Sequence, residues 1–293
     1  MSTKTWLAAH THDLTGVTVA ITGPTGGLGT ELCRYLAALN ASLVLLDRNP
    51  EKSAVLREQL QAQFPDVSLR RIPLDLADIT SVRVACEQLK ALPIDVLIHN
   101  AGAYSIPRRT CDTGLDNVFQ INCASPYYLT RELLPLLRER SGRVVMVSSI
   151  AHNYSQSDPN DMDFSTRRPA RLVYGNAKRH LMCALHQLFR DETDATLSVV
   201  HPGITFTNIT SHYPPLIFTV IKHPMKVIFM KPAKAALCLL AGVFSPCEYN
   251  TWIGPRLWNI WGLPLKKHLH TADEAEIKRI AAAAEETYKK LKA

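Results

Sequence analysis

A glycine-rich turn directly follows the first apolar run of this chain. Residues 17–21 form that run, and the segment at 22–29 reads Thr-Gly-Pro-Thr-Gly-Gly-Leu-Gly. A dinucleotide-binding turn needs one glycine to reverse the chain, one to let the backbone approach a pyrophosphate, and one to pack helix against strand. Gly23, Gly27 and Gly29 have a spacing that suits these three tasks. The sequence therefore predicts a phosphate-binding turn between a strand and a helix.

The residues after this turn extend the same pattern. Apolar residues recur at helical spacing, and the next apolar run, at 43–46, ends on Asp47. A carboxylate about 20 residues after the turn accepts hydrogen bonds from the adenosine ribose and repels a 2′-phosphate. Arg48 favours NADP instead, because an arginine can pair with the 2′-phosphate. We expect NAD as the cofactor, with NADP as the less favoured alternative.

A second motif is the pentapeptide from Tyr174 to Lys178, which reads Tyr-Gly-Asn-Ala-Lys. Side chains four residues apart share one face of a helix, so this phenol and ammonium would suit proton transfer. Tyr288 and Lys292 repeat the spacing in a polar C-terminal segment, where we expect a solvated surface pair. The glycine turn and the Tyr174 motif together predict hydride transfer with a nicotinamide cofactor.

The apolar runs indicate the fold class. Short runs at 17–21, 43–46, 96–98, 144–147 and 197–200 alternate with helical segments, without a linker or an internal repeat. Runs that are apolar on both faces suit a parallel sheet covered by helices on each side. We predict a single α/β domain with a Rossmann-type, doubly wound parallel sheet.

Three segments are expected within the chain. Residues 1–15 form an N-terminal segment, residues 16–255 a dinucleotide-binding catalytic domain, and residues 256–293 a C-terminal extension. The extension should end in a helix opened by Thr271, with Glu274 at capping-box spacing. For Trp258 and Trp261, packing in the core is favoured over a place in the substrate cavity or a subunit contact.

The order of motifs over residues 17–207 resembles the short-chain dehydrogenase/reductase family. After the glycine turn come Asp75-Leu76, His99-Asn100-Ala101-Gly102, Asn122, Ser148-Ser149, Tyr174 with Lys178, and Pro202-Gly203 running to Thr207. His99 departs from the family, which usually has an asparagine there, whereas Asn100 is retained. Segments 119–122, 148–152 and 201–203 most resemble the retinol-dehydrogenase-like group.

The resemblance implies a catalytic set. Tyr174 would be the acid/base, and the positive charge of Lys178 would favour its phenolate form. Lys178 would also hold the nicotinamide ribose, and Asn122 would anchor a water that completes a proton relay. A serine would polarise the substrate oxygen. We assign this role to Ser149 rather than Ser148, because adjacent residues on a strand point to opposite faces.

The resemblance also implies a set of cofactor contacts, spread over the loops that follow the strands. These residues are Thr22, Gly23, Thr25, Gly27, Leu28, Gly29, Asp47, Arg48, Asp75, Leu76, Asn100, Ala101, Gly102, Tyr174, Lys178, Pro202, Gly203, Ile204 and Thr207.

Two segments could shape a substrate site. Residues 153–172 are rich in polar residues and predict a loop, and residues 205–230 contain an apolar stretch that is either a substrate lid or packed core. We expect a bulky apolar alcohol or carbonyl substrate, such as a steroid, a retinoid or another lipid. The alternative is a non-catalytic dinucleotide-binding redox sensor or scaffold.

Composition narrows the partners. The net charge of +7 is spread along the chain without a nucleic-acid-binding module, so it fits an anionic cofactor and a possible contact with a membrane surface. Seven cysteines without a CxxC pair predict buried, reduced thiols rather than disulfides, and the eleven histidines predict no metal site. Without a signal peptide or a long apolar span, we expect a cytoplasmic protein. The family resemblance implies a homo-oligomer.

Overall fold

The structure is a computed structural model that describes residues 2–205, 230–269 and 272–293. Most of the expected substrate lid at 205–230, including its cofactor contact Thr207, lies outside the described residues, as does the expected helix start Thr271.

One sheet forms the centre of the molecule. Among the described residues it has eight strands in the order β3-β2-β1-β4-β5-β6-β7-β8. The strands pair in parallel from β3 to β7, and β8 is antiparallel to β7. Their bounds are β1 Thr18–Thr22, β2 Ser42–Asp47, β3 Leu69–Pro73, β4 Val96–His99, β5 Arg143–Val147, β6 Thr196–Val200, β7 Thr251–Leu257 and β8 Trp261–His268.

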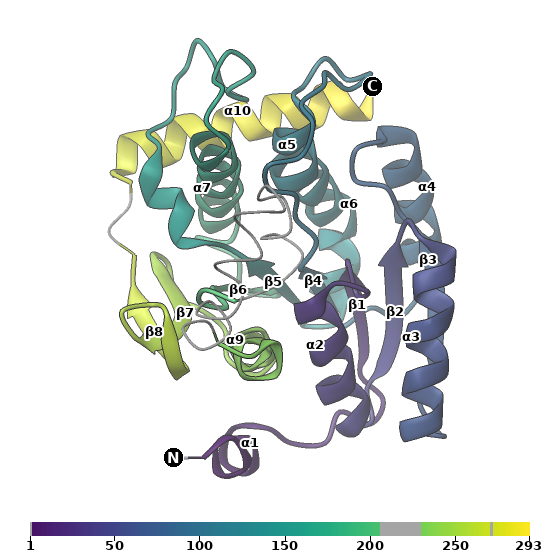
Figure 1. The fold of residues 1–293 in the computed structure, drawn as a ribbon. Helices are drawn as coiled ribbons and strands as arrows, with labels where there is room; N and C mark the ends of the chain where they lie inside the picture. The colour runs from purple at the N-terminus through teal and green to yellow at the C-terminus, as the bar shows by residue number, and fades with distance from the viewer. Residues whose placement is uncertain (1, 206–229, 270–271) are drawn as a thin grey trace, which may run out of the picture.

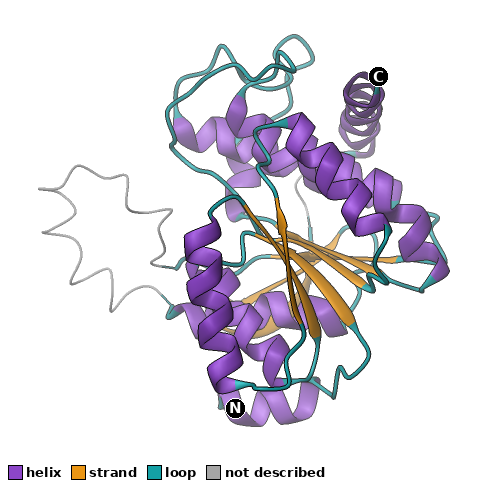
Figure 2. Cartoon of the chain, turned by 90° about the vertical axis from the view of Figure 1, so that its right-hand side faces the viewer, coloured by secondary structure: helices purple, strands orange, loops and turns teal. Residues whose placement is uncertain are grey.

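Helices cover both faces of this sheet (Figures 1 and 2). One layer contains α1 Thr3–His10, α2 Gly27–Ala38, α3 Pro50–Gln63 and α9 Pro232–Phe244. Buried residues of these helices, such as Trp6, Leu32 and Leu237, form a hydrophobic core with that face of the sheet. The other layer contains α4 Ile79–Lys90, α6 Ser125–Glu139, α7 Ala170–Leu188 and α10 Glu274–Lys292. The predicted doubly wound α/β domain is confirmed.

Three short elements complete the description. They are α5 Asn117–Phe119, the π-helical turn η1 Gln120–Ala124 and the 3-10 helix η2 Ile150–Tyr154. Of the loop predicted at 153–172, residues 155–169 have no helix or strand, whereas residues 153–154 belong to η2 and residues 170–172 to the first turn of α7. In the sheet, the chain reverses its direction of winding between β1 and β4, and the parallel strands around this point end at a common edge. That edge is where ligands bind in open α/β sheets.

The β7–β8 hairpin corrects one expectation. Trp258 and Asn259 adopt the left-handed conformation, with φ of 50° and 59°, at the turn of the hairpin. This turn turns the Trp258 side chain outward, so 79% of the residue is exposed instead of packed in the core. Trp252 in β7 is buried, and Trp261 is partly buried. The boundary that the sequence predicted between the catalytic domain and the C-terminal extension, at 255/256, falls inside β7.

The C-terminal helix differs from the sequence-based expectations at two residues. Asp273, not Thr271, is the N-cap of α10, since its carboxylate accepts a hydrogen bond from the backbone N–H of Glu276 at 2.7 Å. Tyr288 is not a solvated surface residue. It is 8% exposed, and its hydroxyl lies 2.6 Å from a carboxylate oxygen of Glu132 on α6. The apolar side of α10 packs on α6 and α7 and takes Tyr288 inward.

The seven cysteines are free thiols, six of them buried and Cys247 partly buried. Within the described ranges, no helix is long and apolar enough to cross a membrane.

Candidate active site

The turn between β1 and α2 leaves a helix N-terminus open at the ligand-binding edge. Gly26 is the N-cap of α2, and no side chain makes a capping hydrogen bond there. The first N–H groups of the helix therefore point at a space that suits a phosphate. Thr25 and Leu28 are partly buried in the turn, and Gly27 is exposed.

Two glycines of this turn are required by close contacts. Gly23 has a φ of +64°, and a Cβ there would lie 3.0 Å from the Cα of Ala101. A Cβ at Gly29 would lie 2.4 Å from the carbonyl oxygen of Gly23, so helix and turn approach too closely for any side chain. Gly23 thus suits the reversal of the chain, and Gly29 suits the close packing of helix against turn.

The end of β4 is joined to the same turn. The amide of Asn100 donates hydrogen bonds to the carbonyls of Thr22 and Gly23, both at 2.9 Å. The backbone N–H of Ala101 donates to the hydroxyl of Thr22 at 3.0 Å. Asn100 therefore holds the β1 and β4 ends together at the point where the winding reverses.

Asp47 ends β2 and presents a buried carboxylate. One oxygen accepts a hydrogen bond from the Nε of Arg71 at 3.1 Å, and Oδ2 is buried without a hydrogen-bond partner in the described structure. An unpaired buried carboxylate oxygen fits a hydroxyl donor such as the adenosine ribose. Arg48 is exposed. The dinucleotide therefore fits the residues at this end of the cradle.

Asp75 and Leu76 follow β3 and are used in local hydrogen bonds. The Asp75 carboxylate accepts from the N–H of Ala77 at 2.9 Å, and the Leu76 carbonyl accepts from the hydroxyl of Ser125 at 2.7 Å. These bonds fix the loop after β3 against the start of α6.

Ser149 and Tyr174 come together across the gap between β5 and α7. The Ser149 side chain lies close enough to the phenol to lower the Tyr174 pKa, whereas the hydroxyl of Ser148 points elsewhere, 3.8 Å from the sulfur of Met182. The ring of Tyr104 packs edge-on against the ring of Tyr174, with centroids 5.4 Å apart. Of the two serines, Ser149 is thus the one that faces the phenol.

Lys178 and Asn122 lie on the other side of this group, beside Gly102. A Cβ added to Gly102 would lie 2.9 Å from Oδ1 of Asn122 and 3.6 Å from Nζ of Lys178. Asn122 sits in the π-helical turn η1, where its amide donates to the carbonyl of Ala103 at 2.9 Å. Lys178 Nζ donates to the carbonyl of Val147 at 2.9 Å.

Burial shifts the pKa values of both titratable groups. It raises the pKa of Tyr174, which the Ser149 hydrogen bond partly offsets, and it lowers the pKa of Lys178 to about 8. Lys178 Nζ lies over the Tyr174 ring, 5.7 Å from its centroid, and is bonded to Val147. The expectation that the Lys178 charge favours the phenolate form of Tyr174 stays a prediction.

The segment after β6 closes the described part of the site. Gly203 has a φ of +84°, and a Cβ there would lie 2.6 Å from the carbonyl oxygen of Ile260. Pro202 is buried, and the carbonyl of Ile204 accepts from the N–H of Met230 at 3.1 Å. The chain therefore enters and leaves the 206–229 segment at one place, beside the β7–β8 hairpin.

Two residues of this site were missed from the sequence. Arg71 reaches Asp47 because β2 and β3 pair in parallel with Asp47 opposite Pro73, a register that no sequence motif marks. Tyr104 follows Gly102 by two residues, and an aromatic residue so close to the β4 end was the available signal. Its contact with Tyr174 depends on the path of an irregular loop.

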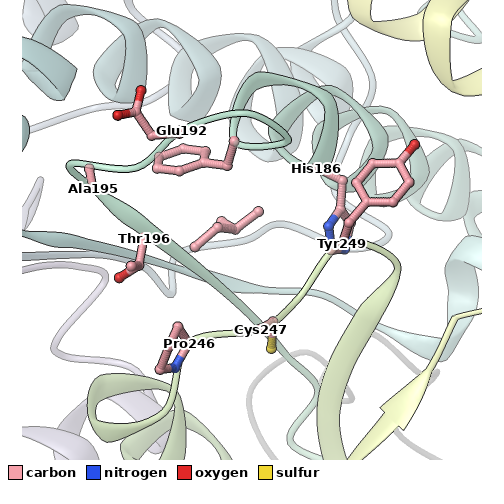
Figure 3. A pocket seen from close by; sticks show the side chains of 9 residues that line it. His186, Glu192, Ala195, Thr196, Pro246, Cys247 and Tyr249 are labelled. Atoms are coloured by element: carbon pink, nitrogen blue, oxygen red, sulfur yellow. The ribbon is translucent and has the colours of Figure 1, made fainter.

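A separate small cavity lies at the opposite edge of the sheet (Figure 3). Its lining includes His186 from α7, Thr196 from β6, and Cys247 and Tyr249 from the segment after α9. Thr196 is the first residue of β6, whereas Ser149 and Gly203 follow strand ends. We assign the cavity no part in the chemistry. Among the described residues, no group of three or more His, Cys, Asp or Glu side chains could hold a metal ion.

Comparison with known proteins gives one consistent result. The family model described as short chain dehydrogenase matches residues 17–215. The chloroplastic short-chain dehydrogenase TIC 32 A of Brassica napus is 30% identical over 218 residues, which is 69% of this chain and 68% of that protein. Retinol dehydrogenase 14 of Homo sapiens is 32% identical over 215 residues, 67% of this chain and 64% of that protein. A crystal structure of an uncharacterized protein from Mycobacterium paratuberculosis has a TM-score of 0.76 at 25% identity, covering 96% of this chain and 97% of its own.

Proposed function

This chain belongs to the short-chain dehydrogenase family of NAD(P)-dependent oxidoreductases, and from that membership we propose that it interconverts a bulky apolar alcohol with its ketone or aldehyde. The observation that carries the proposal is the grouping of Lys178, whose Nζ lies 5.7 Å from the centroid of the Tyr174 ring, with Asn122 beside Gly102 and with Ser149 beside the phenol. It places a donor and an acid/base group side by side, next to the cradle formed by the β1–α2 turn.

Tyr174 would move the proton and Ser149 would hold the substrate oxygen. In reduction, the carbonyl oxygen would accept hydrogen bonds from both hydroxyls, and Tyr174 would give its proton to that oxygen as the carbon receives the hydride. In oxidation, the Tyr174 phenolate would accept the proton of the carbinol hydroxyl as the hydride leaves the carbon, while Ser149 donates to the same oxygen. The nicotinamide, when bound, accepts or supplies the hydride. Tyr104 packs on the far side of the phenol and restricts its ring.

Lys178 and Asn122 would supply the positive charge and the proton path. With a pKa of about 8, Lys178 is mostly protonated at neutral pH, so it can donate to ribose hydroxyls. Asn122 Oδ1 accepts from the N–H of Ala103 at 3.2 Å, and it lies beside the same glycine as the ammonium. A water held between Asn122 and Lys178 would connect the phenol to solvent.

We infer NAD as the preferred cofactor. The unpaired Oδ2 of Asp47 supports this inference, because it can accept a ribose hydroxyl and would repel a 2′-phosphate. Arg71 neutralises part of that charge from the other side, so NADP is disfavoured rather than excluded.

A lipid-like substrate is supported by the similarity to retinol dehydrogenase 14 and by the aromatic ring of Tyr104 at the site. Steroids, retinoids and other lipid alcohols remain the class to test. A panel of these and of short aliphatic alcohols, with NAD and with NADP, is read at the nicotinamide absorbance. Turnover of a bulky alcohol supports the proposal.

The second candidate is a redox sensor or scaffold that binds the dinucleotide without turnover. The paired hydroxyls of Ser149 and Tyr174 favour an enzyme, because binding alone has no need of a phenol at this place. Tight cofactor binding by fluorescence titration, with no turnover of any alcohol or carbonyl in the panel, would favour the sensor.

We also propose a peripheral contact with an anionic membrane through the β7–β8 hairpin. Trp258 is 79% and Leu257 is 51% exposed, and exposed Arg256 lies next to them. An exposed tryptophan beside a cation suits the interface of a bilayer. Trp258→Ser should reduce cosedimentation with phosphatidylserine vesicles, with Val55→Ser, at another exposed apolar position, as the control. Equal binding by both variants would contradict this contact.

Light scattering of the vesicle-free sample tests for the proposed homo-oligomer.

A further inference from the structure

A buried ion pair joins α7 to the C-terminal helix α10. Arg179 is 4% exposed and Glu276 is 7% exposed. Their contact is bidentate, with Nε 2.8 Å from Oε1 and Nη2 2.5 Å from Oε2. Burying two charges is costly, and apolar residues of similar size often replace such a pair without loss of stability. The pair therefore calls for an explanation beyond stability.

The remaining polar atoms of the pair hold the segment that follows the catalytic serine. Arg179 Nη1 donates to the carbonyl of His152 at 3.2 Å, and Glu276 Oε1 accepts from the N–H of Ser157 at 3.0 Å. Both ends of the pair thus bind the backbone of η2 or of the loop after it. The guanidinium is suited to this because its planar fork can reach a carboxylate and a carbonyl together.

From His152 the chain of contacts continues to Ser149. The carbonyl of Ser149 accepts from the backbone N–H of His152 at 3.1 Å and from its Nδ1 at 2.5 Å. Nδ1 therefore carries the proton, and burial keeps the ring neutral by lowering the His152 pKa to about 4. Trp252 packs edge-on against the same ring, with centroids 5.2 Å apart.

The backbone of η2 also rests directly on α7 next to the phenol. A Cβ added to Gly175 would lie 2.3 Å from the carbonyl oxygen of Ala151, so there is no side chain between the two elements. A shift of η2 along α7 would therefore change the distance between Ser149 and Tyr174. Arg179, one helical turn beyond Gly175, is the side chain of α7 that bonds to η2 at His152.

We propose that Arg179 and Glu276 are positioning residues, through which α10 fixes the turn at Ser149 beside Tyr174. The pair makes no contact with the reacting atoms. Its effect is to hold His152, which in turn holds the carbonyl of Ser149. This inference rests on the proposed function for its kinetic consequence but not for its structural one.

The test separates positioning from stability. The double variant Arg179→Met/Glu276→Met replaces the pair by apolar side chains of similar length and removes the bonds to His152 and Ser157. We expect its melting temperature to fall only modestly, because the apolar pair replaces the buried charges while the carbonyl of His152 and the N–H of Ser157 lose their partners. Its kcat should fall roughly 10-fold or more, because small misplacements of a reacting group are costly, while KM for the alcohol and the Kd for NAD change little.

A second readout does not depend on turnover. Amide hydrogen exchange of the peptide covering residues 149–157 should be faster in the double variant than in the wild type. If the wild type turns over no alcohol, the proposed function fails, and the exchange rates still decide this inference. Wild-type kcat together with wild-type exchange in the double variant would overturn it.

Two further variants keep the result interpretable. Arg179→Lys retains the charge opposite Glu276 but cannot bond the carboxylate and the His152 carbonyl together, so it should lose kcat and gain exchange like the double variant. It decides the matter if the double variant does not fold. Glu285→Gln breaks another α10 ion pair, to Arg131 on α6 at 3.1 Å, and should leave both readouts unchanged. Equal effects of Glu285→Gln and Arg179→Lys would contradict the specific role of the pair.

Discussion

Replacing Asp47 by serine tests the cofactor preference at its physical origin. The side chain of Asp47 is 4% exposed, one carboxylate oxygen is bonded to Arg71, and Oδ2 has no partner within the described structure. Asp47→Ser removes the negative charge and one acceptor, and it leaves the guanidinium of Arg71 without its carboxylate.

The expected size of the change follows from these contacts. A hydrogen bond to a charged group contributes about 1.5–3 kcal/mol, so kcat/KM with NAD should fall roughly 10- to 100-fold. Two like charges about 4 Å apart interact by about 4 kcal/mol at an effective dielectric of 20. Removing Asp47 should thus relieve repulsion of a 2′-phosphate, and the preference for NAD over NADP should fall by roughly 10²-fold or more.

Steady-state kinetics with both cofactors measures this shift, with Arg48→Ser as a control for an exposed arginine near the same place. In the double variant Asp47→Ser/Arg71→Met the gain with NADP should be smaller, because the freed guanidinium is gone although the Asp47 charge is still absent. The reasoning is refuted if the wild type has a higher kcat/KM with NADP than with NAD, or if Asp47→Ser leaves the preference unchanged.

Three other predictions concern packing and titration. Gly29→Ala places a Cβ 2.4 Å from the Gly23 carbonyl oxygen, so the Kd for NAD by fluorescence titration should rise at least about 10-fold, and an unchanged Kd would contradict the role of this turn. Tyr288→Phe deletes the hydroxyl bonded to Glu132 and should cost about 1 kcal/mol in urea unfolding while kcat stays unchanged, whereas unaltered stability would count against the buried placement. Burial lowers the pKa to about 4 in four histidines, which are His152, His180, His186 and His201. Their pKa values in the unfolded chain are about 6.5, so the unfolded chain binds more protons than the folded chain between about pH 4 and about pH 6.5, and stability should fall as the pH drops through this range. A melting temperature that stays constant from about pH 6.5 to about pH 4 would contradict this prediction.

Strands β1, β2, β4, β5 and β6 could be predicted because they are buried on both faces and stand out as short apolar runs. The predicted run at 43–46 lies within β2 Ser42–Asp47, and the run at 144–147 lies within β5 Arg143–Val147. The β7–β8 hairpin has no such signal, because β8 is an edge strand whose residues are partly buried or exposed. Its turn places Trp258, an apolar residue, in solvent, which composition alone would not suggest.

The site could be predicted as far as local geometry determines it. Strand alternation favoured Ser149 over Ser148, and in the structure the hydroxyl of Ser148 points to the sulfur of Met182. Contacts between distant segments were beyond reach. Arg71 meets Asp47 through strand register, and Tyr288 is buried because α10 lies on α6. Neither arrangement leaves a periodic or motif signature in the chain.

The central claim is that the Tyr174 hydroxyl moves the proton, and Tyr174→Phe tests it most directly. The change deletes only the hydroxyl and leaves the ring packed against Tyr104. The account predicts that kcat for a turned-over alcohol falls by roughly 10²- to 10⁴-fold, with the Kd for NAD within about twofold of wild type. Tyr288→Phe, which deletes a hydroxyl far from the strand ends, is the matched control. A Tyr174→Phe protein that retains near wild-type kcat would contradict the account.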